Sequence, residues 1–538
     1  MDQPQRLMNM ALFSETRRVS LRTYIVFGSL MLLAAAFRLP QLPARPMHSD
    51  EAINADKLGV LLEHGEYKYS AADFHGPTLT YLTWSVARVQ GIRNYADLNE
   101  TTLRLVPALA GILLVGLHLF LTRYIGLLAA AASALLTAIS PAMVYYSRYY
   151  IHEMLFVSFT FAALLTALRY WEARRAVWAA ISGACIGLMF ATKETAIIPV
   201  ACMAVAAAGL AGMNLQKGWR PSGLAALPKH LALALAAAFA ATALLISSFL
   251  TNPRGIADLV FGYRGYFLRG TGVGTPHVHP VGYYLRLMNF YRADTGPLFT
   301  EALITILAII GLVAVIREWN KHHEASGFRL FLAIYSVAMV VVFSALPYKL
   351  PWNFLGPMHG MILLSGIGVS AWSESCRWSA LRAGAAALVL IGLVHLGWQA
   401  WRSSFPLNSD PRNPWVYAHT SKDVFTIVQK MELLAAAYPA RRADLPIAIV
   451  SRENLWPLPW YFRRFPRVQW WNGISDTASP APVYLITPDM EMALTRRLYD
   501  LPPLGERELY RNLFDPPVEL RPGVEIRGFA SMSAWEGL

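Results

Sequence analysis

The sequence predicts an all-α protein that crosses a membrane about eleven times and carries a small α/β domain at its C-terminal end. Hydrophobic residues make up 55% of the 538 positions and charged residues only 15%, whereas average soluble domains carry about 25% charged residues. Apolar runs of about 20 residues, the length that a spanning helix needs, recur along the chain. Beyond Trp401 the chain becomes more polar. We therefore expect a transmembrane module at 1–400 and an extracytoplasmic domain at 401–538.

Eleven apolar runs are expected to span the cytoplasmic membrane, and they lie at about 22–39, 103–121, 127–146, 154–170, 176–191, 196–213, 231–250, 298–316, 328–346, 353–372 and 379–398. With the N-terminus in the cytoplasm, the short connections on that side are basic, as the positive-inside rule requires. These connections are Arg123, 169–175, 217–230, 317–323 and 376–382. An odd number of spans places the C-terminal domain outside. The formal charge of +13 is then explained by the loops, and no nucleic-acid partner is expected.

The first run has an alternative explanation as a cleaved signal peptide, because two arginines precede it and small residues stand at 34–36. Many further spans follow, so we favour an uncleaved helix. The three cysteines are Cys185, Cys202 and Cys376, which fall in apolar spans or in a short basic loop. We expect neither disulfides nor a cysteine metal site.

Two helices are expected in the first outer loop, residues 40–102. Residues 51–63 place leucines on one side and are followed by His64-Gly65, a stop signal. Residues 76–90 are apolar and aromatic but too short to span, which indicates a helix lying in the membrane interface. In the C-terminal region, 421–438 and 488–498 predict helices, and 446–450 and 483–487 predict buried strands.

The noteworthy polar clusters all fall on the outer side of this topology: His48, Asp50 and Glu51; Asp73 and His75; Arg148, His152 and Glu153; Lys193 and Glu194; Arg254; Tyr348 and Lys349. Charges at helix ends also serve as membrane anchors or local ion pairs. Arg148 could pair with Glu153, and Lys193 with Glu194. The mixture of carboxylates, cations and histidines on one side favours a site, because the opposite loops are almost purely basic.

The Asp50-Glu51 pair suits either the first turn of a helix, where acids are stabilised, or general-base chemistry. A carboxylate there could take a proton from an acceptor as it attacks a sugar carbon. The leaving phosphate would need cations, and Lys193, Arg148 and Arg254 lie at the right depth.

Two further patterns carry weaker signals. His277 and His279 form a His-x-His pair in a glycine-rich loop, for which we favour substrate contacts over a metal site. No strong metal set is visible, and dependence on a divalent cation is left open. Trp470-Trp471 and the segment 456–460 are aromatic enough to stack on a glycan, although packing inside the domain is favoured.

The order of these motifs resembles the GT-C superfamily of membrane glycosyltransferases, which includes protein O-mannosyltransferases and the aminoarabinose transferases that modify lipid A. Asp50-Glu51-Ala52 is similar to the acidic motif of that superfamily, and Ser147-Arg148 through Glu153 to its second acidic motif, with Glu where many members have Asp. The remaining similar segments are His75-Gly76-Pro77, 103–108 and Lys193. Residues 410–415 and 460–463, with the whole layout, resemble a subgroup named for an archaeal flippase-associated protein.

The resemblance implies a sugar transfer from a polyprenyl-phosphate donor to an acceptor at the outer face, with inversion at the sugar carbon. It implies Asp50 as the base, Glu51 as its orienting partner or an acceptor contact, Glu153 as a second acidic residue, and Lys193 with Arg148 as a phosphate clamp. Substrate contacts are expected from His48, His75, His152, Tyr348, Lys349, His277 and His279.

The alternative functions are a non-enzymatic lipid-linked sugar flippase or transporter component, and an assembly protein whose outer domain recruits partners. Transporters usually show paired repeats and interrupted helices, and neither is clear in this sequence. The enzyme hypothesis requires Asp50, Glu153 and Lys193 to converge on one outward cavity.

Overall fold

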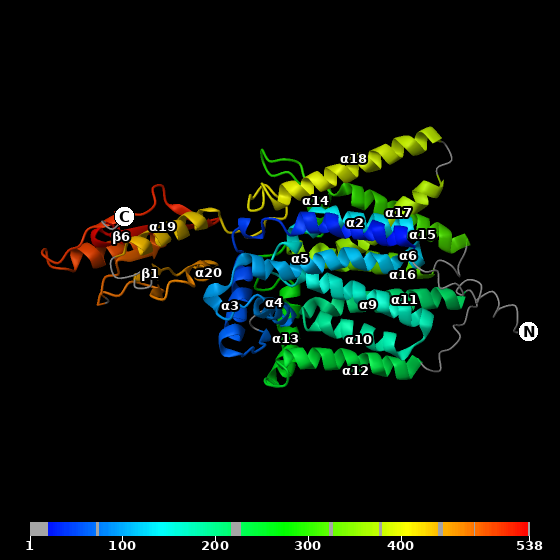
Figure 1. The fold of residues 1–538 in the computed structure, drawn as a ribbon, viewed down its shortest axis with the longest axis horizontal. Coiled ribbons are helices and arrows are strands. Elements are labelled where there is room, and N and C mark those ends of the chain that lie inside the picture. Colours follow the sequence, from blue (N-terminus) through cyan, green and yellow to red (C-terminus); the bar gives the residue numbers. More distant parts are fainter. Residues whose placement is uncertain are drawn as a thin grey trace, which may run out of the picture.

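The computed structural model describes residues 20–71, 75–216, 227–321, 327–375, 379–438, 445–477 and 479–535. Asp73, Cys376 and parts of three expected basic loops lie outside these ranges. Long helices run side by side, and the C-terminal strands lie at one end of the bundle, beyond α3 and α4 (Figure 1).

All eleven expected spans are helical. Within the described ranges, nine helical stretches are long and apolar enough to cross a membrane. Their main helices are α2 (Leu21–Arg38), α5 (Glu100–Leu117), α9 (Glu153–Ala173), α11 (Ile197–Gln216), α12 (Leu227–Ile246), α15 (Ala302–Lys321), α16 (Gly327–Ala345), α17 (Leu355–Ser375) and α18 (Ser379–Ser404).

The other two spans depart from the expected form. The run at 127–146 forms α7 (Leu127–Ile139) and α8 (Pro141–Ser147), bent by 58°. The bend follows from Pro141, which begins α8 while Ser140 caps its N-terminus. The run at 176–191 forms α10 (Ala176–Phe190), with only 15 residues.

Small residues let α10 lie directly against α12. A Cβ added at Gly183 would come 2.0 Å from the carbonyl oxygen of Ala234, and one at Gly187 would come 2.4 Å from that of Ala238. The two glycines are four residues apart, so they lie on one face of α10. This is the close backbone approach typical of GxxxG packing in membranes.

Helices and strands cap one end of the bundle. The first outer loop forms α3 (Ser49–His64) and α4 (Thr78–Val89), as predicted, and the fourth outer loop contributes α13 (Arg254–Gly270) and α14 (Tyr283–Asn289). Figure 1 shows α3, α4 and α13 at the same end as the C-terminal strands. The polar residues of these segments are therefore gathered at one end of the molecule.

The C-terminal region is an α/β unit, as predicted, with α19 (Asp423–Ala437), α20 (Leu458–Phe462), α21 (Glu491–Thr495) and α22 (Met532–Trp535). Its six strands are β1 (Ile447–Val450), β2 (Val468–Trp471), β3 (Val483–Ile486), β4 (Tyr510–Asn512), β5 (Val518–Arg521) and β6 (Val524–Ser531). The strand order is β2-β1-β3-β6-β4, with β5 on β6. β1 is parallel to β2 and β3, and β6 is antiparallel to its neighbours.

The hydrophobic core continues from the helical bundle into the α/β unit. One cluster of buried residues includes Phe27 and Leu114 of the bundle, Trp415 of the connection, and Ile427 and Ile526 of the C-terminal region. The hydroxyl of Tyr146 also donates to the carbonyl oxygen of Trp415 at 2.7 Å. The C-terminal unit is therefore packed onto the bundle over a shared core.

Candidate active site

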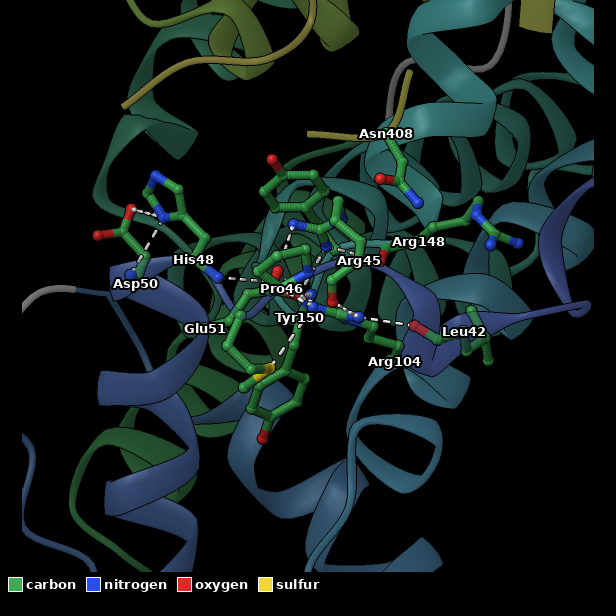
Figure 2. A network of polar contacts seen from close by, with 12 residues as sticks. Leu42, Arg45, Pro46, His48, Asp50, Glu51, Arg104, Arg148, Tyr150 and Asn408 are labelled. Carbon is green, nitrogen blue, oxygen red and sulfur yellow. Dashed lines mark hydrogen bonds and ion pairs between the residues drawn. The ribbon is translucent and has the colours of Figure 1, made fainter. Parts of the chain in front are cut away.

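The start of α3 is organised by a buried carboxylate, Glu51, which is 0% exposed. Its oxygens accept hydrogen bonds from Arg104 at 2.8 and 2.9 Å, from Arg45 at 3.0 Å, and from the backbone N–H groups of His48 and Tyr150, both at 2.8 Å. Figure 2 shows these groups pointing inward around the carboxylate. Arg104 also donates to the carbonyls of Leu42, Arg45 and Pro46. Glu51 thus joins the first outer loop to α5 and to the segment between α8 and α9.

Electrostatics keeps this carboxylate ionised. Burial alone would raise the pKa of Glu51, but the adjacent Arg104 and Arg45 guanidinium groups bring that pKa well below its usual range. The oxygens of Glu51 are occupied and the side chain has no exposed surface. The enclosed Glu51 carboxylate cannot contact an acceptor in this arrangement, which leaves the other predicted role, that of positioning Asp50 through the start of α3.

Asp50 has the opposite environment, with 41% of its side chain exposed. Its backbone N–H donates to Nδ1 of His48 at 3.1 Å, which caps the helix, and its carboxylate lies 3.9 Å from the same nitrogen. It lines a pocket whose wall is formed by Asp50, Ile53, Asn54, His75, Ile151, His152, Glu153 and Trp352. The Asp50 carboxylate is the accessible member of the acidic pair.

A second acidic residue reaches the same pocket from α9. The carboxylate of Glu153 accepts from Nζ of Lys193 at 2.5 Å, and that ammonium also donates to Oδ1 of Asn353 at 2.9 Å. Both charged side chains are at most 5% exposed. Oε2 of Glu153 is buried with no hydrogen-bond partner among the described residues. An unpaired buried acceptor is costly, so this oxygen is poised to accept from a ligand.

The ion pairs differ from the local pairs considered from the sequence. Glu153 pairs with Lys193 rather than with Arg148, and Glu194 pairs with His75, whose Nδ1 lies 2.8 Å from Oε2. Each pair joins segments that are distant in the sequence. The polar groups around His75, Glu153 and Lys193 therefore meet at one place.

His152 lies between these pairs as a neutral imidazole. Its Nε2 donates to the carbonyl of Gly76 at 3.0 Å, and its Nδ1 is buried without a partner among the described residues. Burial, followed by the nearby His75 and Lys193, holds the pKa of His152 well below its usual range. The His75 and His152 rings are 5.0 Å apart. The free Nδ1 is a hydrogen-bond acceptor at the pocket wall.

The three predicted phosphate-binding cations differ in their contacts and exposure. Arg148 is 6% exposed, and its guanidinium donates to the carbonyls of Phe37, Arg38, Pro40 and Gln41 at 2.7 to 3.4 Å. It caps the C-terminal end of α2, so its predicted clamp role is wrong for this arrangement. Arg254 is exposed at the first residue of α13 and makes no hydrogen bond or ion pair to a described residue. Lys193 alone of these three contacts the pocket wall.

The histidine loop borders the site through backbone pairing. Val278 bridges Tyr348, and the N–H of Lys349 donates to the carbonyl of His277 at 3.0 Å. Burial lowers the pKa of His277 against the opposing field of Asp50, and burial raises the pKa of Tyr348 with Asp50 and Glu194 adding to the rise. His277 and Tyr348 thus lie within electrostatic reach of Asp50.

Lys349 and His279 have structural contacts. The Lys349 ammonium is 0% exposed and donates to the carbonyls of His279, at 3.1 Å, and Leu346. The predicted substrate contact of Lys349 is therefore wrong for this arrangement, because the buried ammonium is bonded to the loop that contains His279. His279 stacks on Tyr283 with ring centroids 4.1 Å apart. His48 is buried, and its Nε2 has no partner among the described residues.

Several site residues were not identified from the sequence: Arg45, Ile53, Asn54, Arg104, Ile151, Trp352 and Asn353. A signal existed for Arg104, because an arginine near the start of an apolar run needs an anionic partner. The others are ordinary loop or helix residues whose position depends on packing.

The described residues contain no group of three or more His, Cys, Asp or Glu side chains arranged to hold a metal ion. The free volume of the pocket is about 20 Å³, and one water needs roughly 10–15 Å³ by this measure. In this conformation the pocket has room for little more than a water molecule, although it is lined by charged and hydrogen-bonding groups.

Comparisons with known proteins agree with this architecture. Residues 75–246 match the sequence model of the family of dolichyl-phosphate-mannose-protein mannosyltransferases. The matched range includes His152, Glu153 and Lys193 but not Asp50. A search of curated proteins finds no match.

Solved structures share the fold at low sequence identity. ArnT from Cupriavidus metallidurans, bound to undecaprenyl phosphate, has 15% identity and a TM-score of 0.60, over 95% of this chain and 98% of that chain. The oligosaccharyltransferase of Archaeoglobus fulgidus in the apo form has 14% identity and a TM-score of 0.53, over 85% of this chain and 65% of that chain. The archaeal oligosaccharyltransferase AglB of the same organism, in complex with an inhibitory peptide and a dolichol-phosphate, has 14% identity and a TM-score of 0.52, over 88% and 70%.

The fold and the site define a class of protein: a multi-pass membrane protein of GT-C architecture whose polar residues converge at one end of its helices. More particularly, the chain shares the fold of the ArnT and AglB structures and places in one pocket wall an exposed Asp50 and a buried Glu153, which is paired with Lys193.

Proposed function

We propose that this protein is an integral membrane glycosyltransferase that moves a sugar from a polyprenyl-phosphate donor to an acceptor. The observation that carries the proposal is the convergence of Asp50, His152 and the Glu153–Lys193 pair on one pocket. Sugar transfer requires a base that can reach the acceptor, a cation for the leaving phosphate and hydrogen-bonding groups for the sugar, and this site has an exposed carboxylate beside a buried ion pair and a neutral imidazole. The shared fold and the match at 75–246 support the same class of reaction.

Asp50 is the proposed general base. The acceptor's hydroxyl or amine attacks the anomeric carbon of the donor sugar, and the bond from that carbon to the lipid-phosphate oxygen breaks. Asp50 takes the proton that the acceptor loses, and the polyprenyl phosphate leaves with the bonding electrons. A direct displacement of this kind inverts the anomeric carbon. The exposed Asp50 side chain can reach an acceptor, whereas the enclosed Glu51 cannot.

Lys193 is the proposed partner of the leaving phosphate. Its ammonium already pairs with Glu153, so a donor phosphate would share this cation. The unpaired oxygen of Glu153 and Nδ1 of His152 would accept hydrogen bonds from sugar hydroxyls. Because the pocket has room for only about one water molecule, donor binding requires its walls to separate.

The proposed orientation places the pocket at the outer face of the cytoplasmic membrane. The basic connection at Arg123, in α6 (Thr122–Ile125), lies at the opposite end of the bundle from α3, α4 and the C-terminal unit (Figure 1), as the positive-inside rule requires for a cytoplasmic end. The N-terminus would then be cytoplasmic and the α/β unit extracytoplasmic.

The test measures the transfer of a labelled sugar from each of a panel of polyprenyl-phosphate sugars. Membranes of the host cell supply the acceptor. Asp50→Asn should fold normally and reduce transfer by about two to four orders of magnitude. Asp97→Asn, an exposed carboxylate of the same loop, is the matched control and should transfer normally.

Undiminished transfer by Asp50→Asn would rule out Asp50 as the base. Lys193→Gln should mainly raise the KM for the donor, because the cation contacts the phosphate in the bound donor as well as in the transition state. Movement of the lipid-linked sugar across the membrane without any transfer would instead support a flippase.

A further inference from the structure

The C-terminal unit contains a second pocket, at the carboxyl ends of the parallel strands β1 and β2. Its volume is about 320 Å³, and its lining residues are Ile449, Ser451, Glu453, Asn454, Leu455, Trp456, Pro459, Trp470, Trp471 and Asn472. Small-molecule sites start near 300 Å³. The crevice outside the carboxyl ends of the strands is also where open α/β sheets bind ligands. Both size and position suit a small ligand.

Tryptophans supply the apolar part of the lining. Trp470 is 44% exposed, although it lies in a regular strand. Successive strand residues point to opposite faces, and the neighbouring Trp471 packs against the smaller core cluster. Trp460, by contrast, is 0% exposed. Packing therefore accounts for Trp460 and in part for Trp471. The Trp470 ring meets that of Phe462 edge-on, with centroids 6.4 Å apart, and 44% of the residue stays exposed.

The polar part of the lining is acidic or neutral. The Glu453 carboxylate and the Asn472 amide make no side-chain hydrogen bond or ion pair to a described residue. Oδ1 of Asn454 accepts from the N–H of Trp456 at 2.9 Å, which leaves its NH₂ group available. No Lys, Arg or His is among the lining residues. The lining side chains thus include a carboxylate and no cation, although Arg521 is bonded to the carbonyls of Asn454 and Trp456, so the lining itself favours a neutral ligand over an anion.

A saccharide has both properties that the lining requires. One face of a sugar ring presents C–H groups, which can lie flat on an indole, and its edge presents hydroxyls, which donate to a carboxylate and bond to amides.

This pocket is connected to the catalytic end of the bundle. The carbonyl of Trp456 accepts from Oγ of Ser49 at 3.2 Å and from Arg521 at 3.1 Å. Arg521 also donates to the carbonyl of Asn454. Ser49 is the residue before Asp50, so the wall of the second pocket is bonded to the first turn of α3. A saccharide held in the second pocket would thus contact a wall that is bonded to the turn carrying the proposed base.

We propose that the pocket between Trp456, Trp470 and Asn472 binds a neutral saccharide unit of the acceptor. The assignment to the acceptor rests on the proposed glycosyltransferase function, whereas saccharide binding itself does not. The acceptor would accordingly be a glycan or a glycosylated molecule.

The test is saturation-transfer NMR on the full chain in detergent micelles. The probes are the methyl glycosides of D-mannose, D-galactose, N-acetyl-D-glucosamine and D-arabinofuranose. At least one probe should receive saturation from the protein, and Trp470→Ala should reduce that signal at least fivefold. Trp470→Phe should retain part of it, because the ring remains. The matched control, Trp171→Ala, removes a tryptophan that is 48% exposed elsewhere and should leave the signal unchanged.

Equal signals for Trp470→Ala and the unaltered protein, or no saturation of any probe, would overturn the proposed saccharide site. Asp50→Asn should retain the full signal, since Asp50 is not in this pocket. If the unaltered protein saturates a probe but transfers no sugar from any lipid-linked donor, the glycosyltransferase proposal fails and the saccharide site stands. If transfer occurs, Trp470→Ala should raise the KM for the acceptor and leave the KM for the donor unchanged.

Discussion

At the scale of single residues, the adjacent carboxylates Asp50 and Glu51 have different roles because they point in different directions. Successive helix residues are about 100° apart around the axis, so α3 directs one carboxylate to the pocket and the other toward Arg45 and Arg104. Their exposures are 41% and 0%. Glu51 positions the helix that carries Asp50, and Asp50 is free for chemistry.

We predict that Glu51→Gln destabilises the fold by about 3–5 kcal/mol, because two buried guanidinium groups lose their shared counter-charge. The thermal unfolding midpoint of the detergent-solubilised chain would measure this loss. Asp50→Asn, the neighbouring substitution, should unfold at nearly the same temperature as the unaltered protein. A Glu51→Gln variant that is as stable as the unaltered chain would contradict the framework role.

His152 makes stability depend on pH. Its pKa in the folded protein is well below its usual value, and an unfolded histidine titrates near about 6.5. The unfolded chain therefore binds a proton more readily than the folded chain, so the contribution of His152 is present above about pH 6.5 and is lost as the pH falls. Burial is the main cause of the low pKa of His152, and the nearby His75 and Lys193 add to it by disfavouring a positive charge on the ring.

We predict that the unfolding midpoint of His152→Gln falls less between pH 7 and pH 5 than that of the unaltered protein. Gln keeps a donor for the carbonyl of Gly76 but cannot be protonated in this range. The measurement is thermal unfolding at several pH values. Parallel pH profiles for the two proteins would show that the histidine contributes nothing to acid sensitivity.

At the scale of elements, the site depends on how closely the start of α4 approaches the end of α10. The N–H of Gly76 donates to the carbonyl of Thr192 at 3.1 Å, and its carbonyl accepts from His152. Thr78 and Thr192 are joined through their hydroxyls at 2.8 Å. A Cβ at position 76 would lie 2.1 Å from the carbonyl oxygen of Ala191. Only glycine permits this contact, which holds His152 beside Lys193.

We predict that Gly76→Ala costs about 1–3 kcal/mol of stability through overpacking and reduces sugar transfer. The helix would move away from α10, and the hydrogen bond to His152 would weaken. The matched control is Gly28→Ala in α2, where nothing lies within 4 Å of the added Cβ. The measurements are the unfolding midpoint and the transfer rate of each variant. If Gly76→Ala matches Gly28→Ala in both, the close approach of α4 to α10 is not needed.

At the scale of the whole molecule, the C-terminal unit completes the loop that presents Asp50. The N–H of Met47 donates to the hydroxyl of Tyr461 at 2.8 Å, and its carbonyl accepts from Thr420 at 2.7 Å. Nε1 of Trp460 donates to Glu100 at 2.8 Å, at the start of α5. The residues before α3 are thus held between the bundle and the α/β unit.

We predict that Tyr461→Phe leaves the buried N–H of Met47 without a partner, at a cost of about 1–3 kcal/mol. Because this N–H lies three residues before Asp50, kcat for transfer should fall more than the KM for the donor changes. Tyr438→Phe is the control, since the Tyr438 hydroxyl makes no hydrogen bond to a described residue. Unaltered kcat in Tyr461→Phe would show that the C-terminal unit does not position the base.

The amino-acid sequence by itself determined the approximate bounds of the apolar helices, the end of the bundle at which the polar residues gather, and the two strands β1 and β3 of the C-terminal sheet. These features follow from local hydrophobicity, charge and helix-stop signals, which are properties of contiguous residues. The sequence predicted eleven spans, whereas nine helical stretches of the described residues are long and apolar enough, or ten if the bent pair is one span. It also identified Asp50, Glu153 and Lys193 as candidates. The edge strand β2 and the strands after residue 500 were missed, because β2, β4 and β5 are short and at most half-buried and β6, although eight residues long, is fully buried only at alternate positions over most of its length.

Only the tertiary structure decided which charged groups meet. Glu153 pairs with Lys193, which is 40 residues away in the sequence. Glu51 is enclosed by Arg45 and Arg104. The Arg148 guanidinium donates its hydrogen bonds to the carbonyls at the end of α2. It likewise left Trp470 open while burying Trp460. The physical reason is that exposure and partner choice depend on how segments distant in sequence pack together, and this information is absent from any local pattern.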